Sequence, residues 1–157
     1  MEKTNVMRIL DKKKINYNSY SYVDTDAISG VEVATVLNQD PNRVFKTLVT
    51  VSNTNNYFVF VIPSNKELDL KKAAKAVGVK SVSMLKQKDL LSLTGYVHGG
   101  CSPIGMKKSF LTTFDSTSNN FETILFSAGK IGYQVEVNLN DLKNIIKLQI
   151  DNIIVGD

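Results

Sequence analysis

Residues 95–108 form the segment of this chain best suited to chemistry. They read Gly-Tyr-Val-His-Gly-Gly-Cys-Ser-Pro-Ile-Gly-Met-Lys-Lys and lie between apolar segments. Glycine allows positive φ angles and a close approach of the backbone to a ligand, and proline fixes the direction in which the chain leaves. Such loops present backbone N–H groups that suit an anion or a developing oxyanion. The sequence therefore predicts a binding or catalytic site at this loop.

A lysine inside an apolar stretch is the second candidate for chemistry. Residues 44–51 read Val-Phe-Lys-Thr-Leu-Val-Thr-Val, and strand alternation places Lys46 on the same face as Val44, Leu48 and Thr50. One interpretation is a strand whose outer face is solvated. The other is a lysine that points into a cleft and offers a fixed positive charge to an anionic or carbonyl group. The pattern alone leaves both open.

Three further patterns do not fit the chemistry that they resemble. Residues 100–107 are close to a phosphate-binding P-loop, but their lysine is displaced by one position and Pro103 removes a backbone N–H. Residues 127–130 fit the S-x-x-K motif of penicillin-binding proteins, whose partner motifs are missing. Cys101 lies three residues from His98 with no further Cys or His to support a catalytic pair, so a structural thiol is the better interpretation.

Composition bounds the class of protein. The 157 residues suit a single domain with a sizeable core, and we expect one domain over residues 1–157. One cysteine and one histidine exclude an internal disulfide and any site with several Cys or His ligands, so we expect no metal and no cofactor. We expect neither a signal peptide nor a membrane span, and the single thiol fits a reducing cytoplasm. The net charge of +4 suits either a polyanionic partner or a solvated lysine surface.

Strands dominate the elements that must position these residues. Apolar periodicity predicts helices over residues 4–14, 29–37, 68–77 and 141–147, with a helical turn at 89–93. Alternating or β-branched runs predict strands over residues 17–23, 44–51, 57–62, 80–85, 110–114, 123–126, 133–137 and 153–155. Ser29 and Glu32 form a capping box, and Gly78 is placed to end the third helix. We expect an α+β fold with a mixed, mostly antiparallel, barrel-like sheet flanked by helices.

Three motifs of this chain taken together resemble the YbaK/EbsC family. The motifs are Val44-Phe45-Lys46-Thr47-Leu48, Gly95-Tyr96-x-x-Gly99-Gly100-x-Ser102-Pro103-x-Gly105-x-Lys107-Lys108, and Ser127-x-Gly129-Lys130 before a strand. Members of this family are free-standing aminoacyl-tRNA deacylases related to the editing domain of some bacterial prolyl-tRNA synthetases. The resemblance covers essentially the whole chain and implies a mixed, barrel-like sheet flanked by helices.

The resemblance implies hydrolysis of mischarged tRNA, above all Cys-tRNA(Pro), without a cofactor. In the family the cysteinyl sulfur of the substrate attacks its own ester, which explains why this chain shows no catalytic triad and no metal site. The implied partners are aminoacyl-tRNA and a prolyl-tRNA synthetase working alongside. Two alternatives stay open: a deacylase for another small aminoacyl group, as in Ala-tRNA(Pro), and a non-catalytic module that binds tRNA or a synthetase.

The resemblance also assigns roles to individual residues. It implies a catalytic group made of Lys46 near the ester, the N–H groups of two glycines near the substrate carbonyl, and a serine on the opposite wall: Lys46, Gly99, Gly100 and Ser127. It implies a substrate-binding group made of Tyr22, Thr47, Ser102, Pro103, Gly129 and Gln134. Tyr20 is an alternative to Tyr22, because it lies two residues away on the same face of the expected strand.

Two positions depart from the family pattern. Ser29 stands where many relatives carry an aromatic residue, and Gln134 stands where some carry Asp. Both departures bear on the range of aminoacyl groups accepted. Eight lysines are candidates for contacts with tRNA phosphates that do not read sequence: Lys12, Lys13, Lys14, Lys71, Lys72, Lys75, Lys107 and Lys108.

Overall fold

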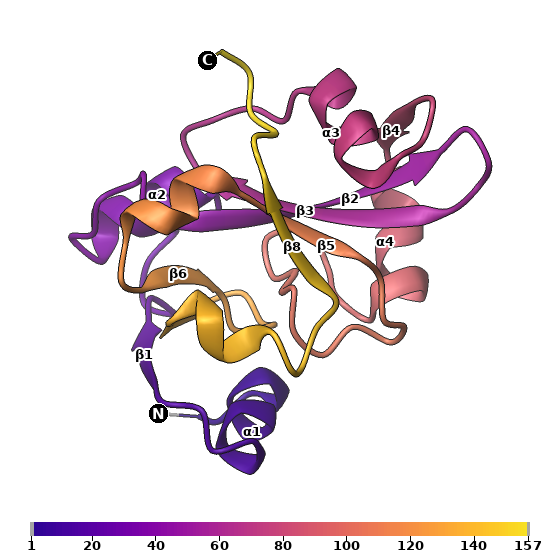
Figure 1. The fold of residues 1–157 in the computed structure, drawn as a ribbon. Coiled ribbons are helices and arrows are strands. Elements are labelled where there is room, and N and C mark those ends of the chain that lie inside the picture. Colours follow the sequence, from indigo (N-terminus) through magenta and orange to yellow (C-terminus); the bar gives the residue numbers. More distant parts are fainter. Residues whose placement is uncertain (1, 157) are drawn as a thin grey trace.

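Two β-sheets form the framework of the computed structural model, which describes residues 2–156 (Figure 1). The smaller sheet is antiparallel, with the strand order β1-β7-β6: β1 is Tyr17–Ser21, β7 is Tyr133–Val137 and β6 is Ile124–Ser127. The larger sheet has the order β4-β2-β3-β5-β8: β4 is Val82–Met84, β2 is Phe45–Ser52, β3 is Tyr57–Pro63, β5 is Thr112–Asp115 and β8 is Leu148–Asp151. β2 pairs antiparallel with β3 and β4, whereas β5 pairs parallel with β3 and β8.

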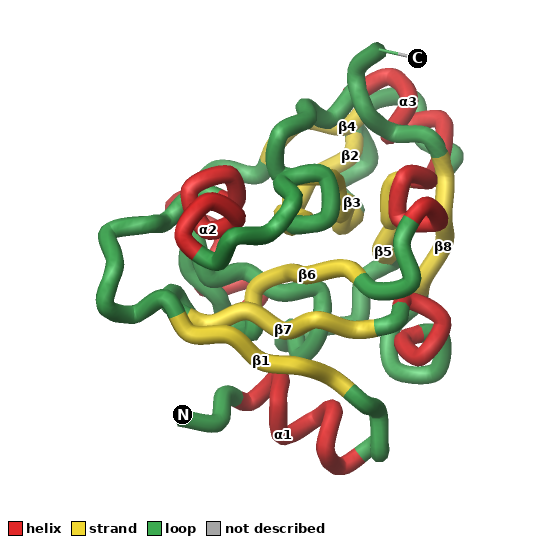
Figure 2. Tube along the Cα trace, turned by 90° about the vertical axis from the view of Figure 1, so that its left-hand side faces the viewer, coloured by secondary structure: helices red, strands yellow, loops and turns green. Residues whose placement is uncertain are grey.

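The mixed α+β class is confirmed, but the sheet does not close as a barrel. The two sheets meet at one isolated parallel bridge between Val44 and Leu125. Beyond that bridge they separate into two layers, and Figure 2 shows β1, β7 and β6 below the larger sheet. The separation matters because it leaves space between the layers next to β2.

In residues 2–156 four α-helices flank the sheets, and two of their ends follow capping signals read from the sequence. α1 is Asn5–Lys12, α2 is Gly30–Val36, α3 is Leu70–Val77 and α4 is Gln87–Thr94. The predicted capping box is present, because the Ser29 hydroxyl accepts from the Glu32 N–H and the Glu32 carboxylate accepts from the Ser29 N–H. Gly78 ends α3 with a φ of 73°, as predicted.

The C-terminal region differs from the prediction. The helix expected over residues 141–147 is wrong: a short 3₁₀ helix, Leu139–Leu142, forms instead. The N–H groups of Ile145 and Ile146 both donate to the Leu142 carbonyl, which tightens the turn and stops the helix. The chain then enters β8, a strand that the pattern did not predict because its parallel pairing with β5 is a tertiary contact. The final strand expected at 153–155 is reduced to a bridge between Ile154 and Leu68.

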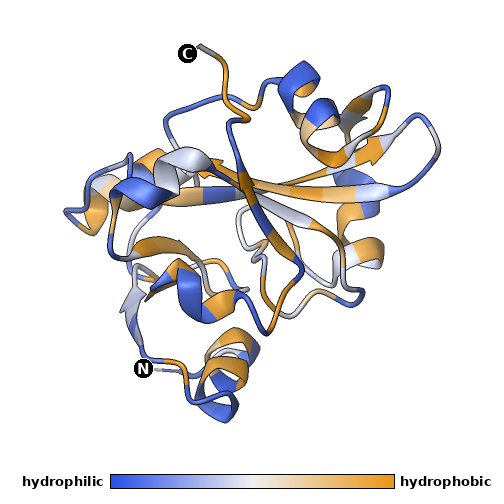
Figure 3. Ribbon diagram, viewed as in Figure 1, coloured by the Kyte–Doolittle hydropathy of each residue, from blue (hydrophilic) through white to orange (hydrophobic). Residues whose placement is uncertain are grey.

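The main core fills the space between the two sheets and α1. It includes Met7 and Leu10 of α1, Val135 of β7, Phe114 of β5 and Phe126 of β6. Figure 3 shows apolar residues along β6, polar residues on much of β8, and both kinds on the helices. A second cluster packs α3 against the opposite face of the larger sheet. In the described residues no helix is long and apolar enough to cross a membrane.

Candidate active site

A cavity of about 340 Å³ lies beside β2, where the two sheets separate. The parallel bridge between Val44 and Leu125 places β2 and β6 side by side, with both strands running in the same direction. Lys46 and Ser127 each lie two residues beyond that bridge, so they face the same space from opposite sheets. The loop of residues 98–101 and the segment that leads into α2 complete the walls.

The cavity brings together five of the ten predicted site residues. These five are Lys46, Thr47, Gly99, Ser127 and Gln134. The other lining residues are Ile28, Ser29, Gly30, Val33, Phe45, Leu48, Ser64, Leu90, His98 and Cys101. The five predicted residues that do not line it are Tyr22, Gly100, Ser102, Pro103 and Gly129.

One edge of β2 is open along this cavity. β4 pairs with residues 50–52 of β2 and, within the described chain, leaves residues 45–48 without a partner strand on that side. The Val44 carbonyl accepts from Ser64 on the β3 side, and the Val49 carbonyl accepts from Leu85 on the β4 side. Because antiparallel hydrogen bonding alternates along a strand, the N–H and C=O of Thr47 point to the open edge. The backbone of β2 thereby supplies both a donor and an acceptor to the cavity.

Lys46 supplies a positive charge without a partner. Its side chain is partly buried, and the hydrogen bonds and ion pairs found within residues 2–156 leave its ammonium unengaged. Burial lowers the pKa of Lys46 below its ordinary value, and the nearby charge of Glu67 opposes that shift. Lys46 thus lies where the cleft interpretation expects it, half-buried on a cavity wall, and its role there stays a prediction.

Two buried polar atoms on the cavity wall also have no partner. Thr47 Oγ1 and Gln134 Oε1 make no hydrogen bond in the part of the chain that the structure describes. Gln134 is only 5% exposed. Leaving a buried donor or acceptor unpaired costs roughly 1–3 kcal/mol, so such atoms are rare unless a ligand or water satisfies them. Their presence in the lining of one cavity is typical of a polar ligand site.

Ser127 is oriented by Gly129, which lies behind the wall and not on it. The Ser127 hydroxyl oxygen accepts from the Gly129 N–H at 3.1 Å, so its own hydrogen remains able to donate. Gly129 has a φ of 90°, and a Cβ there would lie 2.9 Å from the Tyr96 ring and 3.0 Å from Val6. Gly129 is not among the residues that line this cavity; its N–H holds the Ser127 hydroxyl, and its lack of a side chain leaves room for Val6 of α1.

The glycine loop contributes Gly99 but not Gly100. Gly99 lines the cavity with a φ of 88°. The Gly100 N–H donates to the Val97 carbonyl at 3.0 Å, so it is already engaged. The Gly100 N–H is therefore not free to donate in this structure, and donation by Gly99 to a substrate carbonyl stays a prediction. Ser102 is fully buried and its hydroxyl accepts from the Ile104 N–H, which makes it a turn residue and not a pocket residue.

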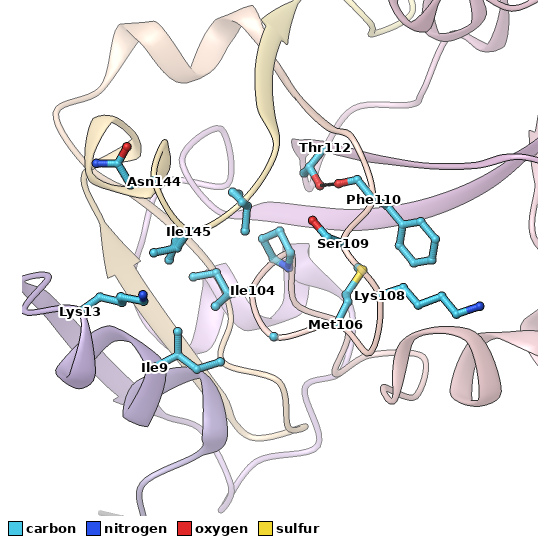
Figure 4. Close-up of a pocket in the computed structure, with 13 residues that line it drawn as sticks. Ile9, Lys13, Ile104, Met106, Lys108, Ser109, Phe110, Thr112, Asn144 and Ile145 are labelled. Atoms are coloured by element: carbon cyan, nitrogen blue, oxygen red, sulfur yellow. Dashed lines mark hydrogen bonds between the residues drawn. The ribbon is translucent and has the colours of Figure 1, made fainter.

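Pro103 faces a different cavity, shown in Figure 4. This second cavity, of about 280 Å³, is bounded by Ile9 and Lys13 on the side of α1 and by Asn144 on the side of the C-terminal turn. The loop of residues 98–105 thus separates two spaces. The prediction that Pro103 binds substrate in the cavity of Lys46 does not fit its placement.

Neither tyrosine lines the cavity. The Tyr20 hydroxyl donates to Glu136 at 2.5 Å and is committed to that carboxylate. The Tyr22 hydroxyl is buried and unpaired within the described residues. Tyr22 packs in a cluster with Val33, which itself lines the cavity. Both tyrosines adjoin residues of the lining, because Tyr22 packs beside Val33 and Tyr20 is the cross-strand partner of Gln134.

Several lining residues gave no sequence signal or were set aside. A Cβ on Gly30 would lie 2.5 Å from Ser64 Cβ, so only glycine allows α2 to approach the end of β3 this closely. Cys101 and His98 do line the cavity. Burial raises the pKa of Cys101 to about 12, which keeps the thiol protonated and argues against a protein nucleophile. In residues 2–156 no group of three or more His, Cys, Asp or Glu side chains is placed to hold a metal ion.

Comparison with known families now bears on this site. A sequence model of the aminoacyl-tRNA editing domain matches residues 25–145. The chain belongs to this family. The match spans α2, β2, the glycine loop, β6 and β7, which are the elements that build the cavity. The resemblance indicated by the three motifs is thereby confirmed.

Relatives within the family include proteins of two kinds. The chain is 49% identical over 137 residues, 87% of its length and 84% of the relative, to an Enterococcus faecalis protein named as a Cys-tRNA(Pro)/Cys-tRNA(Cys) deacylase, EbsC. It is 28% identical over 102 residues, 65% of its length, to 18% of a proline–tRNA ligase of Shouchella clausii. A solved structure described as a trans-editing enzyme for prolyl-tRNA synthetase has the same fold, with a TM-score of 0.82, 17% identity, and coverage of 99% of this chain and 100% of the other.

Proposed function

We propose that this protein, as one editing domain over residues 1–157, hydrolyses the ester of mischarged aminoacyl-tRNA, with Cys-tRNA(Pro) as its preferred substrate. The observation that carries the proposal is the cavity between the two sheets, which is lined by the unpaired ammonium of Lys46 and by Thr47 and Gln134 with their unpaired polar atoms. Family membership and the name of the Enterococcus relative support the choice of reaction and substrate.

The proposed chemistry takes its nucleophile from the substrate. The cysteinyl sulfur attacks the carbonyl carbon of its own ester, a C–S bond forms and the C–O bond to the terminal ribose breaks. The thiol proton ends on the ribose oxygen, giving a four-membered thiolactone and uncharged tRNA, and water then opens the thiolactone to cysteine. Well-oriented intramolecular reactions reach effective molarities on the order of 10⁵ M or more, so positioning alone provides much of the rate.

The residues of this chain would position the ester and stabilise developing charge. Lys46 places a cation beside the carbonyl or the ribose oxygen, and charge placed in a partly desolvated site is worth more than in water. The backbone N–H of Gly99 and the hydroxyl of Ser127 are available as donors to the carbonyl oxygen. The high pKa of Cys101 fits a mechanism in which the protein supplies no thiolate.

Selection of cysteine would follow from chemistry more than from size. A difference of one methylene changes binding by only about 1–3 kcal/mol, so a small pocket discriminates weakly between cysteine and alanine. A required thiol excludes alanine outright, because its side chain cannot attack the ester. Gln134 places a neutral amide on the wall where some relatives carry a carboxylate, so we propose that it contacts the polar part of the aminoacyl group through its unpaired oxygen.

The proposed partner is tRNA, reached through exposed lysines in a reducing cytoplasm, with a prolyl-tRNA synthetase working alongside. One of the eight candidate lysines is already used within the protein: the Lys72 ammonium donates to the carbonyls of Ile154 and Gly156 and holds the C-terminal segment. The remaining candidates give weak, salt-sensitive binding, because contacts to phosphates release counterions and do not read sequence.

A panel of four esters on the same tRNA tests the proposal. Wild-type protein is mixed with tRNA(Pro) carrying cysteine, S-methylcysteine, alanine or serine, and loss of each ester is followed against the uncatalysed rate. The proposal expects selective cleavage of the cysteinyl ester, with methylation of the sulfur abolishing it. Equal cleavage of the alanyl ester would show that the site activates water and would refute the thiol mechanism. Binding without cleavage of any ester would favour a non-catalytic module.

A further inference from the structure

We infer that an apolar rim at the mouth of the cavity packs against the terminal adenine base of the tRNA that carries the ester. The rim consists of Val23, Ile28 and Ile131, which come from three different segments of the chain. The inference rests on the proposed function and names a part of the substrate that the cavity itself does not hold.

These three aliphatic residues are each exposed. Val23 is 51% exposed, Ile28 50% and Ile131 41%. Single exposed aliphatic residues are ordinary on protein surfaces, but a contiguous group beside a functional cavity marks a binding surface.

Contacts around two glycines show that the rim is contiguous. A Cβ placed on Gly99 would lie 3.0 Å from Ile28 Cγ2 and 3.6 Å from Ile131 Cδ1, so both isoleucines converge on this glycine. A Cβ placed on Gly132 would lie 2.5 Å from Val23 Cγ1, which brings Val23 to the residue that follows Ile131. The absence of side chains at both glycines lets the three residues gather over the loop.

The rim continues directly into the cavity. Ile28 belongs to both the rim and the lining of the space that holds Lys46, and Gly99, next to Ile28 and Ile131, also lines that space. An aminoacyl ester is attached to the terminal ribose, and the adenine base is attached to the same sugar ring. When the ester carbonyl lies beside Lys46 and Gly99, the base therefore cannot be far from the mouth, where the rim lies.

A base fits this rim better than the other occupants of an apolar surface. Aliphatic and aromatic side chains pack on the flat face of a nucleobase in enzymes that act on nucleic acids. A stable protein partner needs about 800 Å² on each side, far more than three partly exposed side chains present.

Two model esters separate the base from the rest of the substrate. One is the 3′-cysteinyl ester of adenosine, and the other is the same ester of methyl riboside, which has the sugar but no base. Wild-type protein, Val23→Ser and Ile131→Ser, two rim residues that do not line the cavity, are compared with Met84→Ser, a control residue on β4 that is 45% exposed. We expect wild-type kcat/KM to favour the adenosine ester about 5- to 10-fold, equivalent to about 1–1.4 kcal/mol.

The variants decide the inference. Each rim substitution should remove most of the preference for adenosine and leave cleavage of the riboside ester unchanged, while Met84→Ser keeps the preference. A rim variant that keeps the wild-type preference, or that slows both esters equally, would overturn the inference. If wild-type protein cleaves neither ester, the result contradicts the proposed function, and contact between the rim and the base is decided by the binding experiment below.

Binding gives a readout that does not require cleavage. Isoleucine methyl signals are recorded by NMR while the amide analogue 3′-cysteinylamino-3′-deoxyadenosine is added. Stacking predicts ring-current shifts at the Ile28 and Ile131 methyl groups that the riboside amide does not cause. Equal shifts with both amides would contradict contact with the base.

Discussion

Replacement of Glu136 by Gln tests how the two sheets are held together next to the cavity. The Glu136 carboxylate forms an ion pair with Arg43 and accepts from the hydroxyls of Tyr20 and Thr123, both at 2.5 Å. Arg43 also donates to the Thr123 carbonyl at 3.0 Å and to Gln39 at 2.9 Å. This network joins β1, β6 and β7 to the segment that leads into β2, three residues before Lys46.

The magnitude follows from burial and from the number of donors. The side chain of Glu136 is 11% exposed and that of Arg43 is 23% exposed, so solvent screens the pair only in part. Breaking a fully buried ion pair costs about 3–5 kcal/mol, and hydrogen bonds to charged groups contribute about 1.5–3 kcal/mol. Because the amide of Gln keeps the shape and some of the acceptor capacity, we expect Glu136→Gln to lower the free energy of unfolding by about 2–3 kcal/mol.

The pH dependence of this loss gives a second, independent check. Burial alone would raise the pKa of Glu136, but hydrogen bonds from Thr123, Tyr20 and Asn18 and the charge of Arg43 outweigh it and lower the pKa below the ordinary 4.5. A carboxyl group with a lowered pKa stabilises the folded state above its unfolded pKa, and this contribution is lost as pH falls through the folded pKa. The difference between wild type and Glu136→Gln should thus be constant from pH 6 to 8 and shrink below about pH 4.5.

Urea unfolding followed by circular dichroism at a series of pH values measures both effects. Glu2→Gln is the control, because Glu2 pairs with Lys130 on the surface, where both side chains are more than half exposed. That control should leave the unfolding midpoint unchanged, since exposed pairs contribute little. The reasoning is refuted if Glu136→Gln is as stable as wild type at pH 7, or if its deficit persists undiminished at acidic pH.

Three further predictions follow from individual residues. Gly129→Ala should lower the free energy of unfolding by about 2 kcal/mol or more, because the added Cβ is strained at a positive φ and contacts Tyr96. Gly78→Ala has the same strain but its Cβ meets no described atom within 4 Å, so it should lower this free energy by only about 1 kcal/mol. Urea unfolding compares the two variants. Cys101→Ala should keep hydrolysing Cys-tRNA(Pro) in a deacylation assay, since the buried thiol is protonated, and loss of cleavage with unchanged folding would contradict this. Burial lowers the pKa of Lys46 below its ordinary 10.5, so the enzymatic rate, corrected for spontaneous hydrolysis, should begin to fall with rising pH before pH 10.5 is reached. Arginine stays charged at these pH values, so a Lys46→Arg variant that shows the same fall would mean that another group titrates.

Local signals made much of this fold predictable. The Ser29 capping box, the αL glycine at residue 78 and the alternation of residues 44–51 each depend on neighbours in sequence, and each element forms as expected. β8 escaped prediction because it is stabilised by parallel pairing with β5, which lies more than 30 residues earlier in the chain. The barrel expectation failed for a related reason, since the single bridge at Val44 and Leu125 is a long-range contact without a sequence pattern.

Sequence reasoning found a site residue only where an unusual residue type stands at a position that also lines the cavity. Lys46 stood out because a charged residue in an apolar strand requires an explanation, and the structure places it on a cavity wall. Gly100 and Gly129 have the residue type of a site but serve the backbone, because one N–H is used in a turn and the other holds Ser127. Ile28 and Val33 could not be found from sequence, because aliphatic residues at a cavity mouth have the same pattern as residues of a core.

Single-turnover cleavage of Cys-tRNA(Pro) by Lys46→Met tests the central claim most directly. Lys80→Met is the matched control, because Lys80 is an exposed lysine outside the cavity and loses the same charge. The account predicts that Lys46→Met binds the tRNA but cleaves the cysteinyl ester at least about 100-fold more slowly, in line with removal of one charge-stabilising group, while Lys80→Met cleaves at the wild-type rate. Cleavage by Lys46→Met at the wild-type rate would contradict the account, because the reaction would then not depend on the charge in the cavity between the two sheets.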